Sequence, residues 1–586
     1  MEEKKVLLSV KDLYVKFRVR GRILTAIRGI SLDIYENESI AIVGESGSGK
    51  SVFTKTFAGM LDSNGFISEG SLILSDEELA DTCVALNSKE RKLMDWALKN
   101  LNKSARLEHG AATCREMLEL ESEKRARREL SGEEKENAEQ QIKDLIARRT
   151  ELFNELQTYD PRKEKDRIRA AKAKLRDYDA QIKKQKKIHE ALVREKKAVA
   201  AADTAYNKQW EEKMSRLKAR YAEEIQRDAS PAALERNKIL AKEICLSVGR
   251  YSIFKQLRLL RGLLKALKEA MKLGVDLDDD TTRNQVFDPV VFRVRYLDET
   301  AEKLHGTCIL NLANVKDSGD WGKIRGSRIS TVFQDPMTSL NPIITIGKQI
   351  TSVIMRHQGC SESEARRRAL DMMRKVGIPK AEARFDDYPF QYSGGMRQRI
   401  VIAIALSCQP KILICDEPTT ALDVTIQAQI LKLIKDLQKE FGYTIVFITH
   451  DLGVVANIAD RVAVLYAGQV VELGTVEDVF YDPRHPYTWA LLSSLPQLAQ
   501  AGEKLYSITG TPPSLYNQIV GDPFAPRNPY CLKIDTLEEP PMLPVSETHS
   551  AKTWLLDPRA PKIEKPEGIH NIHGKLIHAF NIQEVK

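Results

Sequence analysis

The sequence has no long apolar run and no paired cysteines. No stretch of its 586 residues approaches the roughly 18 consecutive apolar residues of a membrane-spanning helix. The eight cysteines are scattered without a C-x-x-C pair, which argues against a disulfide framework and a structural zinc site. The segment from Met1 to Lys5 leads directly into a strand pattern, so no signal peptide is expected. A reducing cytosol is the simplest compartment for such a chain.

The length excludes a single hydrophobic core, and about three domains are expected. The formal net charge of +8 is unevenly distributed, because residues 162–197 contain 15 Lys or Arg against six Asp or Glu. A basic helical face can bind phosphate in nucleic acid or anionic lipid. The same composition is typical of a solvated helix face, and that alternative stays open.

One glycine-rich stretch is predicted to bind phosphate. A strand pattern precedes it, a helix pattern follows it from Val52, and the stretch fits G-x-x-x-x-G-K-[ST]. It consists of Gly44, Glu45, Ser46, Gly47, Ser48, Gly49, Lys50 and Ser51. Backbone N–H groups and a helix N-terminus can approach the phosphates here. Lys50 is predicted to reach the β- and γ-phosphates, and Ser51 to offer its hydroxyl to Mg²⁺.

Two further apolar strands are predicted to end in reactive side chains. The strand over 411–415 ends in Asp416 and Glu417, and the strand over 444–449 ends in His450. Opposite a phosphate loop, Asp416 can hold Mg²⁺ through water and Glu417 can polarise the attacking water. Two aromatic residues, Tyr14 and Phe17, lie upstream of the loop; either ring could stack on adenine or belong to the strand core.

A third stretch resembles the signature motif of ABC ATPases. It comprises Ser393, Gly394, Gly395 and Met396, with Ser393 as the cap of the following helix. The ordered set of loop, Gln334, signature, Asp416–Glu417, Asp423 and His450 resembles that family, which implies an α/β cassette of the P-loop NTPase type with a helical subdomain. By this resemblance Gln334 contacts Mg²⁺ and senses membrane subunits, and Asp423 belongs to the D-loop. His450 contacts the γ-phosphate, and Phe17 takes the adenine-stacking place.

The resemblance sharpens to the ATP-binding subunits of oligopeptide and dipeptide importers. It rests on four segments, at 333–342, 392–399, 485–488 and 510–515. It implies an ATPase that uses ATP and Mg²⁺ in a sandwich with a second ABC ATPase subunit, usually a paralogue. It also implies two membrane permease subunits, an extracellular substrate-binding protein, and a peripheral place at the cytoplasmic face of the membrane. Nickel or another small solute remains an alternative to peptide, and a second copy remains an alternative to a paralogue.

Four segments are expected: the first part of the ATPase core over 1–74, a helical insertion over 75–304, the second part of the core over 305–495, and a loop-rich extension over 496–586. The insertion is predicted to be all-α, with a coiled-coil-like hairpin that turns at Asp160–Pro161. Its apolar seam contains Ile168, Ala171, Leu175, Tyr178 and Ile182. We expect it to dock a protein partner, lipid headgroups or RNA, or to be a solvated decoration.

The extension departs from the family pattern. Many relatives carry four cysteines here that hold an iron–sulfur cluster, whereas Asp522, Asn528 and Asp535 stand at such positions in this chain, and Cys531 is the thiol left nearby. Cluster ligation ordinarily needs four thiolates, so no cluster is predicted. Three histidines near the chain end, His570, His573 and His578, could bind metal but are more simply a mobile tail.

Two rival functions follow from the same motifs. A DNA-maintenance ATPase also interrupts its cassette with coiled coils. In that class the coiled coils follow the glutamine that corresponds to Gln334, whereas this insertion precedes Gln334. A translation-factor-type ABC protein carries two cassettes, whereas the sequence contains one phosphate loop and one signature. An importer ATPase is therefore the favoured interpretation.

Overall fold

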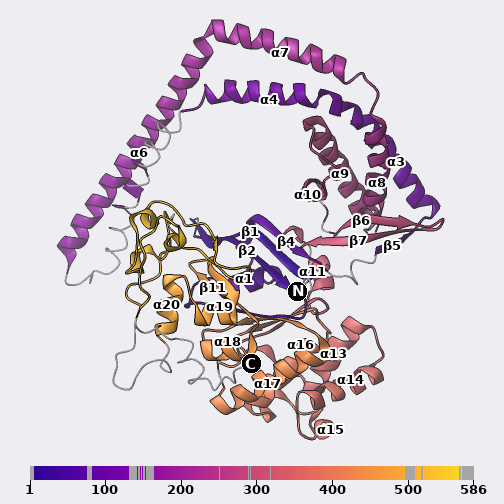
Figure 1. The fold of residues 1–586 in the computed structure, drawn as a ribbon, viewed down its shortest axis with the longest axis vertical. Coiled ribbons are helices and arrows are strands. Elements are labelled where there is room, and N and C mark those ends of the chain that lie inside the picture. The colour runs from indigo at the N-terminus through magenta and orange to yellow at the C-terminus, as the bar shows by residue number, and fades with distance from the viewer. Residues whose placement is uncertain are drawn as a thin grey trace. The chain divides into compact units, whose positions relative to one another are not determined.

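The computed structural model describes most of the chain. The described residues are 5–20, 22–75, 82–130, 141–142, 145–146, 148–149, 152, 164–249, 251–287, 290, 292–316, 318–420, 422–494, 508–516, 519–566 and 569. They divide into two compact units, Met1–Thr82 with Thr307–Lys586, and Cys83–Gly306 (Figure 1). We call these the ATPase unit and the insertion unit.

A largely parallel sheet forms the centre of the ATPase unit. Its strands lie in the order β13-β14-β12-β11-β3-β10-β9-β8. The parallel strands are β8 (Ile329–Val332), β9 (Ile412–Asp416), β10 (Thr444–Ile448), β3 (Ser39–Val43) and β11 (Arg461–Tyr466). The antiparallel strands are β12 (Gln469–Thr475), β14 (Ser550–Ala551) and β13 (Leu543–Pro544). Because β3, β9 and β10 run in parallel, their carboxyl ends meet at one edge, where ligands bind in such sheets.

A second, antiparallel sheet begins the chain. It pairs β1 (Val6–Val19) with β2 (Arg22–Tyr35) and with β4 (Gly65–Leu74). Strand β4 also pairs with the end of β7 (Lys303–Asn311), at Ile73 opposite Asn311 and Leu74 opposite Leu310. The chain thus leaves the ATPase unit after β4 and returns to it at the neighbouring strand.

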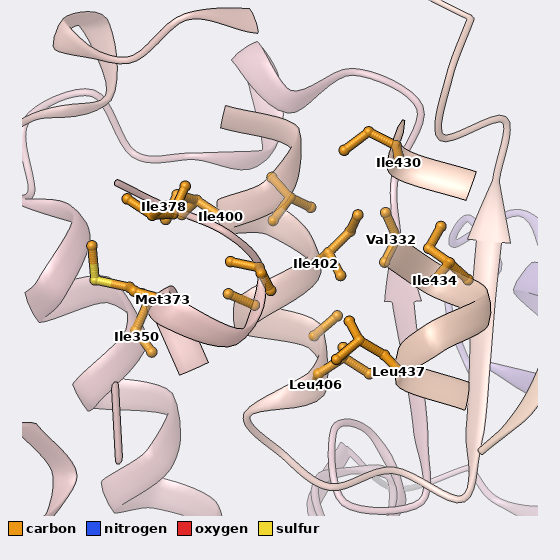
Figure 2. Packing of buried hydrophobic residues seen from close by; sticks show 14 of the residues in the cluster. Val332, Ile350, Met373, Ile378, Ile400, Ile402, Leu406, Ile430, Ile434 and Leu437 are labelled. Carbon is orange, nitrogen blue, oxygen red and sulfur yellow. The ribbon is translucent and has the colours of Figure 1, made fainter. Parts of the chain in front are cut away.

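Helices cover the parallel sheet and build the helical subdomain. They are α1 (Lys50–Phe57), α11 (Ser318–Ile324), α12 (Pro336–Ser339), α13 (Ile346–Gln358), α14 (Glu362–Lys375), α15 (Ala381–Arg384), α16 (Gly394–Leu406), α17 (Val424–Phe441), α18 (Leu452–Ile458), α19 (Val476–Tyr481) and α20 (Pro486–Ser493). Figure 2 shows how Ile400 and Ile402 of α16 pack between Met373 of α14 and Ile434 of α17. This shared core holds the start of α16 at a fixed place relative to the sheet.

The insertion unit is mostly helical. Its helices are α3 (Ser88–Ala105), α4 (Ala111–Ala126), α6 (Lys165–Ala202), α7 (Thr204–Glu224), α8 (Pro231–Val248), α9 (Ile253–Leu273) and α10 (Asp280–Val286). Fully buried leucines and isoleucines of α3, α8 and α9 form its core, among them Leu101, Ile244 and Leu263. Figure 1 shows α4 and α7 running side by side within this unit.

Short 3-10 helices complete the fold. They are η1 (Arg106–Gly110), η2 (Leu312–Asn314), η3 (Pro389–Gln391), η5 (Ala525–Arg527), η6 (Lys533–Thr536) and η7 (Trp554–Leu556). The last three lie in the extension, together with the short strands β13 and β14.

The prediction of an all-α insertion is wrong at its two ends. Strand β5 (Thr82–Ala85) begins this part of the chain, and β6 (Phe292–Glu299) pairs with β7 at its end. In β7, Leu304 and Cys308 are buried while their neighbours are more exposed, which is the alternation of a strand. This period of two was present in the sequence, but it follows a long tract rich in Lys, Glu and Ala that favours helix.

The predicted seam of α6 is its buried side. Ala171 and Leu175 are 4% and 9% exposed, whereas the lysines on the other faces are largely exposed. Arg149 Nε donates to Asp179 Oδ1 at 2.6 Å, which places a second segment of the insertion beside α6. The turn predicted at Asp160–Pro161 lies outside the described residues.

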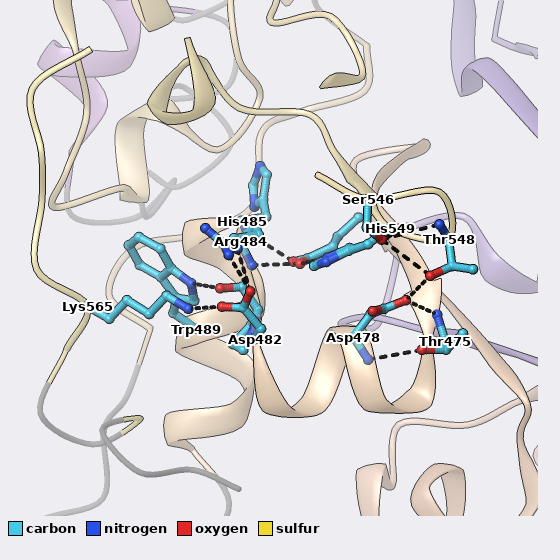
Figure 3. Close-up of polar contacts among 12 residues, drawn as sticks. Thr475, Asp478, Asp482, Arg484, His485, Trp489, Ser546, Thr548, His549 and Lys565 are labelled. Atoms are coloured by element: carbon cyan, nitrogen blue, oxygen red, sulfur yellow. Dashed lines mark hydrogen bonds and ion pairs between the residues drawn. The ribbon is translucent and has the colours of Figure 1, made fainter. Parts of the chain in front are cut away.

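The extension is joined to the ATPase unit rather than separate. Strand β14 pairs with β12 through Ser550 opposite Leu473, and Phe524 is fully buried in the core that includes Tyr466. Figure 3 shows a second junction, where His549 from the extension lies among polar residues of α19 and of the segment before α20. The extension is irregular and proline-rich, so its sequence has no helix or strand periodicity. Its packing against the ATPase unit could therefore not be predicted from the sequence.

None of the helices in the described part of the chain combines the length and the apolar composition that crossing a membrane requires.

Candidate nucleotide-binding and hydrolysis site

A cavity of about 580 Å³ opens at the carboxyl edge of the parallel sheet. Its size is that of a small-molecule site. Its lining consists of Phe17, Val19, Leu24, Ala26, Ser46, Gly47, Gly49, Lys50, Ser51, Val52, Asp62, Gln334, Asp416, Glu417, His450 and Leu515. Most of the residues predicted for nucleotide and metal binding from the loop, the strand ends and Gln334 therefore meet around one space.

The phosphate loop needs its glycines for two different reasons. Gly44 has φ +151°, and a Cβ there would lie 2.2 Å from the carbonyl oxygen of Leu465, so packing forbids a side chain. Gly47 has φ +80°, a left-handed backbone that favours glycine, although a Cβ there would meet nothing within 4 Å. The loop is thus packed against β11 at its start and open toward the cavity in its middle. Ser48 Oγ is buried there without a hydrogen-bond partner among the described residues.

Lys50 is folded back onto the loop. Its Nζ donates to the carbonyl oxygen of Gly44 at 2.7 Å and to that of Glu45 at 3.0 Å. Burial lowers the pKa of Lys50, and the carboxylates of Glu417, Asp416 and Glu45 oppose that shift. The ammonium group is therefore held at the cavity wall by main-chain oxygens and acidic neighbours.

Asp416 and Ser51 face one another across the start of α1. The Ser51 hydroxyl donates to Asp416 Oδ1 at 3.4 Å. Burial raises the pKa of Asp416, with a further rise from the neighbouring carboxylate of Glu417. Two carboxylates this close repel one another when both are charged, so the site favours a positive ligand.

Glu417 is the most heavily constrained side chain of the site. Its Oε2 accepts from Gln334 Nε2 at 2.9 Å and from the Thr420 hydroxyl at 3.2 Å. Its Oε1 lies 3.2 Å from His450 Nδ1. Its φ of +46° is rare for a residue with a side chain, and strain of this kind is characteristic of functional sites. Two residues distant in sequence, Gln334 and His450, and the nearby Thr420 thus fix the orientation of one carboxylate.

Phe17 lies between the strand core and the cavity. Its side chain is 9% exposed, and its ring packs against Gly65, where a Cβ would lie 2.7 Å from Cε1. Tyr14 packs instead against Gly29, where a Cβ would lie 3.0 Å from the Tyr14 hydroxyl oxygen. Of the two aromatic candidates, Phe17 lines the cavity and Tyr14 does not.

The signature and Asp423 are not at this cavity. Ser393 caps α16, accepting from Met396 N at 3.4 Å, and Asp423 caps α17, accepting from Ile426 N at 3.0 Å. A Cβ on Gly395 would lie 2.7 Å from Ile426 Cγ2, whereas one on Gly394 would meet nothing within 4 Å. Gly395 thus allows α16 to approach α17, and Ser393 and Gly394 remain exposed.

Several residues at the site were missed from the sequence. Asp62, Leu515 and the apolar side chains of β1 and β2 line the cavity, and Thr420 holds Glu417. Arg527 forms a bidentate ion pair with Glu45 of the loop, at 2.9 and 3.1 Å. Arg527 lies between Asp522 and Asn528, but no pattern in the sequence indicated its contact with the loop.

The parallel sheet, the glycine loop and the carboxylate pair define an ATPase of the P-loop class. The ABC transporter family matches residues 27–260 and 295–420, and the oligopeptide/dipeptide transporter C-terminal region matches residues 471–534. The chain belongs to the ABC transporter family. The position of the second match agrees with the resemblance seen in the sequence.

Curated relatives support the same membership. The chain is 65% identical over 266 residues to the oligopeptide transport ATP-binding protein AmiE of Streptococcus pneumoniae, covering 45% of this chain and 75% of that protein. It is 59% identical over 258 residues to the oligopeptide transport ATP-binding protein OppD of Bacillus subtilis, covering 44% and 72%. A solved dimeric ATP-binding cassette bound to ADP and Pi aligns at 16% identity and a TM-score of 0.36, covering 80% of this chain and 98% of that one. The relatives and the C-terminal match favour the importer over the DNA-maintenance ATPase.

Proposed function

We propose that this chain is the ATP-hydrolysing, nucleotide-binding subunit that energises an ABC importer for oligopeptides or dipeptides. One observation carries the proposal: a formed cavity lined by both Lys50 and Glu417 occurs in a chain with an oligopeptide/dipeptide transporter C-terminal region. Hydrolysis at the cavity would then be coupled to movement of peptide through separate membrane subunits.

In this proposal Glu417 orients and polarises the attacking water. Its two oxygens are held by Gln334, Thr420 and His450, which leaves the carboxylate directed into the cavity. Lys50 exchanges the carbonyl oxygens of the loop for phosphate oxygens of ATP, and His450 contacts the γ-phosphate. Positioning of this kind is the main contribution of a protein to phosphoryl transfer. Phe17 offers the ring against which adenine stacks.

The residues present fit a magnesium ion. Ser51, Gln334 and Asp416 line the cavity and offer hydroxyl, amide and carboxylate oxygens, and Mg²⁺ prefers oxygen ligands. When bound, Mg²⁺ neutralises charge on the phosphates. The Ser51 hydroxyl and Asp416 Oδ1 lie 3.4 Å apart, a separation that two oxygen ligands of one ion can have.

We also propose a sandwich with a second ABC ATPase subunit. The exposed start of α16 offers backbone N–H groups and the Ser393 hydroxyl without a phosphate loop of its own chain beside it. Val424, next to Asp423, is 83% exposed, so a partner at this end of α17 would remove its side chain from water. Both features are explained if a partner loop closes over them. A paralogue is the usual partner in this family.

Two permease subunits and an extracellular substrate-binding protein complete the proposed importer. The chain itself would lie peripherally at the cytoplasmic face of the membrane. Copurification from membranes tests this directly, because an importer subunit carries permease subunits with it. Recovery of DNA or ribosomes in their place would contradict the proposal, and so would ATP hydrolysis that peptide and the binding protein leave unchanged in reconstituted vesicles.

For the insertion unit we propose a docking role toward a protein partner, lipid headgroups or RNA. Its long helix α6 exposes lysines along most of its surface, which is the observation that supports phosphate-rich partners. Deleting residues 78–303 and rejoining the strands tests whether this docking role is separate from ATP hydrolysis and transport. Survival of both ATPase activity and transport would show that the insertion is dispensable for them.

We propose that the extension holds no iron–sulfur cluster. Asp522 Oδ1 accepts from Phe524 N at 2.9 Å, Asn528 Oδ1 from Tyr530 N at 2.9 Å, and Asp535 Oδ2 from Leu532 N at 2.6 Å. These side chains cap local turns with oxygen where a cluster would need thiolate. A brown, iron-containing purified protein would contradict this.

A further inference from the structure

The extension contacts the phosphate loop through one arginine. Arg527 Nη1 donates to Glu45 Oε2 at 2.9 Å and Nη2 donates to Glu45 Oε1 at 3.1 Å. The arginine side chain is 5% exposed and the glutamate side chain 25% exposed. A bidentate pair that is largely removed from water is among the stronger polar contacts in proteins, and it fixes direction as well as distance.

Arg527 is itself held rigidly. Its Nε donates to the carbonyl oxygen of Thr509 at 3.1 Å, and Nη1 also donates to the Tyr466 hydroxyl at 3.1 Å. The hydrogen bond to Glu45 raises the pKa of Arg527, so the guanidinium remains charged under all ordinary conditions. Phe524, three residues earlier, is fully buried against Tyr466 and Tyr487. The guanidinium group of Arg527 is therefore held in place by tightly packed surroundings.

Every polar group of Glu45 has a partner. Its carboxylate binds Arg527, its backbone N–H donates to the Tyr487 hydroxyl at 2.7 Å, and its carbonyl oxygen accepts from Lys50 Nζ at 3.0 Å. Glu45 is the first residue after Gly44, so its conformation sets the path of the loop toward the phosphates. Residues from the extension and from α20 thus fix the loop from outside the cavity.

We propose that Arg527 is a positioning residue that holds the phosphate loop in its nucleotide-binding conformation through Glu45. The inference rests on the proposed ATPase function. With the pair intact, the loop is ordered before ATP arrives. Without it, ATP must order the loop as it binds, and that cost weakens affinity while the chemistry at Glu417 is unchanged. The extension, none of whose described residues is a reacting group of the cavity, thereby sets the affinity for nucleotide.

The experiment compares variants of the full-length chain. Arg527→Met removes the charge at similar length, Arg527→Lys keeps the charge but loses the fork, and Glu45→Gln breaks the same pair from the loop. Arg559→Met is the matched control, because Arg559 pairs with Asp557 in the same extension and is not among the residues that line the cavity. The dissociation constant for Mg·ATP is measured by displacement of trinitrophenyl-ATP, and KM and kcat by phosphate release.

Arg527→Met and Glu45→Gln are each expected to raise the dissociation constant and KM for ATP about tenfold, with kcat within about twofold. Arg527→Lys should have a smaller effect, and Arg559→Met none. The double variant Arg527→Met with Glu45→Gln should be no worse than either single variant, because both remove one contact. A merely structural role of Arg527 would give effects that multiply.

Affinities within twofold of the unaltered protein for both single variants would overturn the inference, and so would multiplicative effects in the double variant. If Arg527→Met fails to fold, Glu45→Gln decides alone, since it leaves the packing of the extension intact. Failure of the proposed function is a different result: in that case Lys50→Ala would leave ATP affinity and hydrolysis unchanged as well.

Discussion

Two helices of the ATPase unit begin at glycine-rich turns, and they differ in what is left unpaired. Helix α1 begins after Gly49, which has φ +105° and no side chain to cap the helix. Helix α16 begins after Ser393, whose hydroxyl accepts from Met396 N. The first start opens into a cavity surrounded by ionisable groups, and the second is exposed.

The difference agrees with the proposed sandwich, in which this chain would supply two unlike halves of nucleotide sites, a loop half at α1 and a signature half at α16. At α1 the free N–H groups, Lys50 and the carboxylates are already assembled for ATP. The start of α16 is capped and exposed, and the described residues proposed for catalysis line a cavity to which it does not contribute. A third start provides a contrast, since α20 is capped by the ring of His485, whose Nδ1 accepts from Tyr487 N at 3.0 Å. Substitutions can test the roles of these three helix N-termini one at a time.

The largest effect is expected from Lys50→Ala, which disables the loop half. Hydrolysis should fall by roughly 100-fold or more, because the substitution removes a charge aimed at the phosphates. The affinity for ATP should fall as well. Phosphate release and trinitrophenyl-ATP displacement measure the two quantities. Lys439→Ala, at an exposed position in the last turn of α17, is the control and should change neither.

Ser393→Arg should disable the other half. In the isolated chain ATP affinity should stay within about twofold, because Ser393 is not at the cavity. In the assembled complex hydrolysis should fall by roughly 10- to 100-fold, since a bulky cation would stand where the partner's phosphate belongs.

The matched control for this variant is Ser361→Arg. Ser361 caps α14 in the same subdomain with the same geometry, accepting from Glu364 N at 3.4 Å. The same residue change at an equivalent cap should leave the complex active. Full activity of the Ser393→Arg complex would contradict the two-half interpretation.

The loop half could be assembled from the sequence because its parts follow strands. Ile42, Asp416 and Ile448 lie in register on adjacent parallel strands, so the residues that follow each strand must meet at one edge. Gln334 follows β8, the next strand beyond β9. Apolar runs and their ends were sufficient for this part of the site, and likewise for the α/β class of the fold.

The positions of the remaining site residues depend on tertiary packing, which leaves no periodic pattern in the sequence. Arg527 meets Glu45 across 482 positions of sequence, through a segment of turns and 3-10 helices. Leu515 reaches the cavity from the same segment. Thr420 lies between Glu417 and Asp423, but its contact with Glu417 depends on the left-handed backbone of Glu417, which residue type does not predict. Such contacts follow from packing, which local patterns do not encode.

The N-terminus of α20, unlike those of α1 and α16, should make the stability of the fold depend on pH. Burial lowers the pKa of His485 to about 3, from 6.5 in an unfolded chain. Below pH 6.5 the unfolded state therefore binds a proton that the folded state does not, and stability falls as the pH falls. From pH 6.5 to pH 5 this loss is about 2 kcal/mol.

His485→Asn should remove this loss. Asparagine can still accept from Tyr487 N as a cap, but it does not titrate. Urea unfolding followed by tryptophan fluorescence, to which Trp489 of α20 contributes, measures the stability at pH 7.5 and at pH 5. The difference between the two pH values should be about 2 kcal/mol smaller in the variant than in the unaltered protein. An equal difference in both proteins would show that His485 does not titrate on unfolding.

The smallest effect is expected from Thr420→Val, which loosens the catalytic carboxylate without emptying the loop half. The Thr420 hydroxyl donates to Glu417 Oε2 at 3.2 Å, and Gln334 donates to the same oxygen at 2.9 Å. Losing one of these bonds should lower kcat about fivefold, equivalent to about 1 kcal/mol, with ATP affinity unchanged. Thr420→Ser keeps the hydroxyl and should retain most of kcat. A change in affinity larger than the change in kcat would mean that Thr420 serves the loop rather than Glu417.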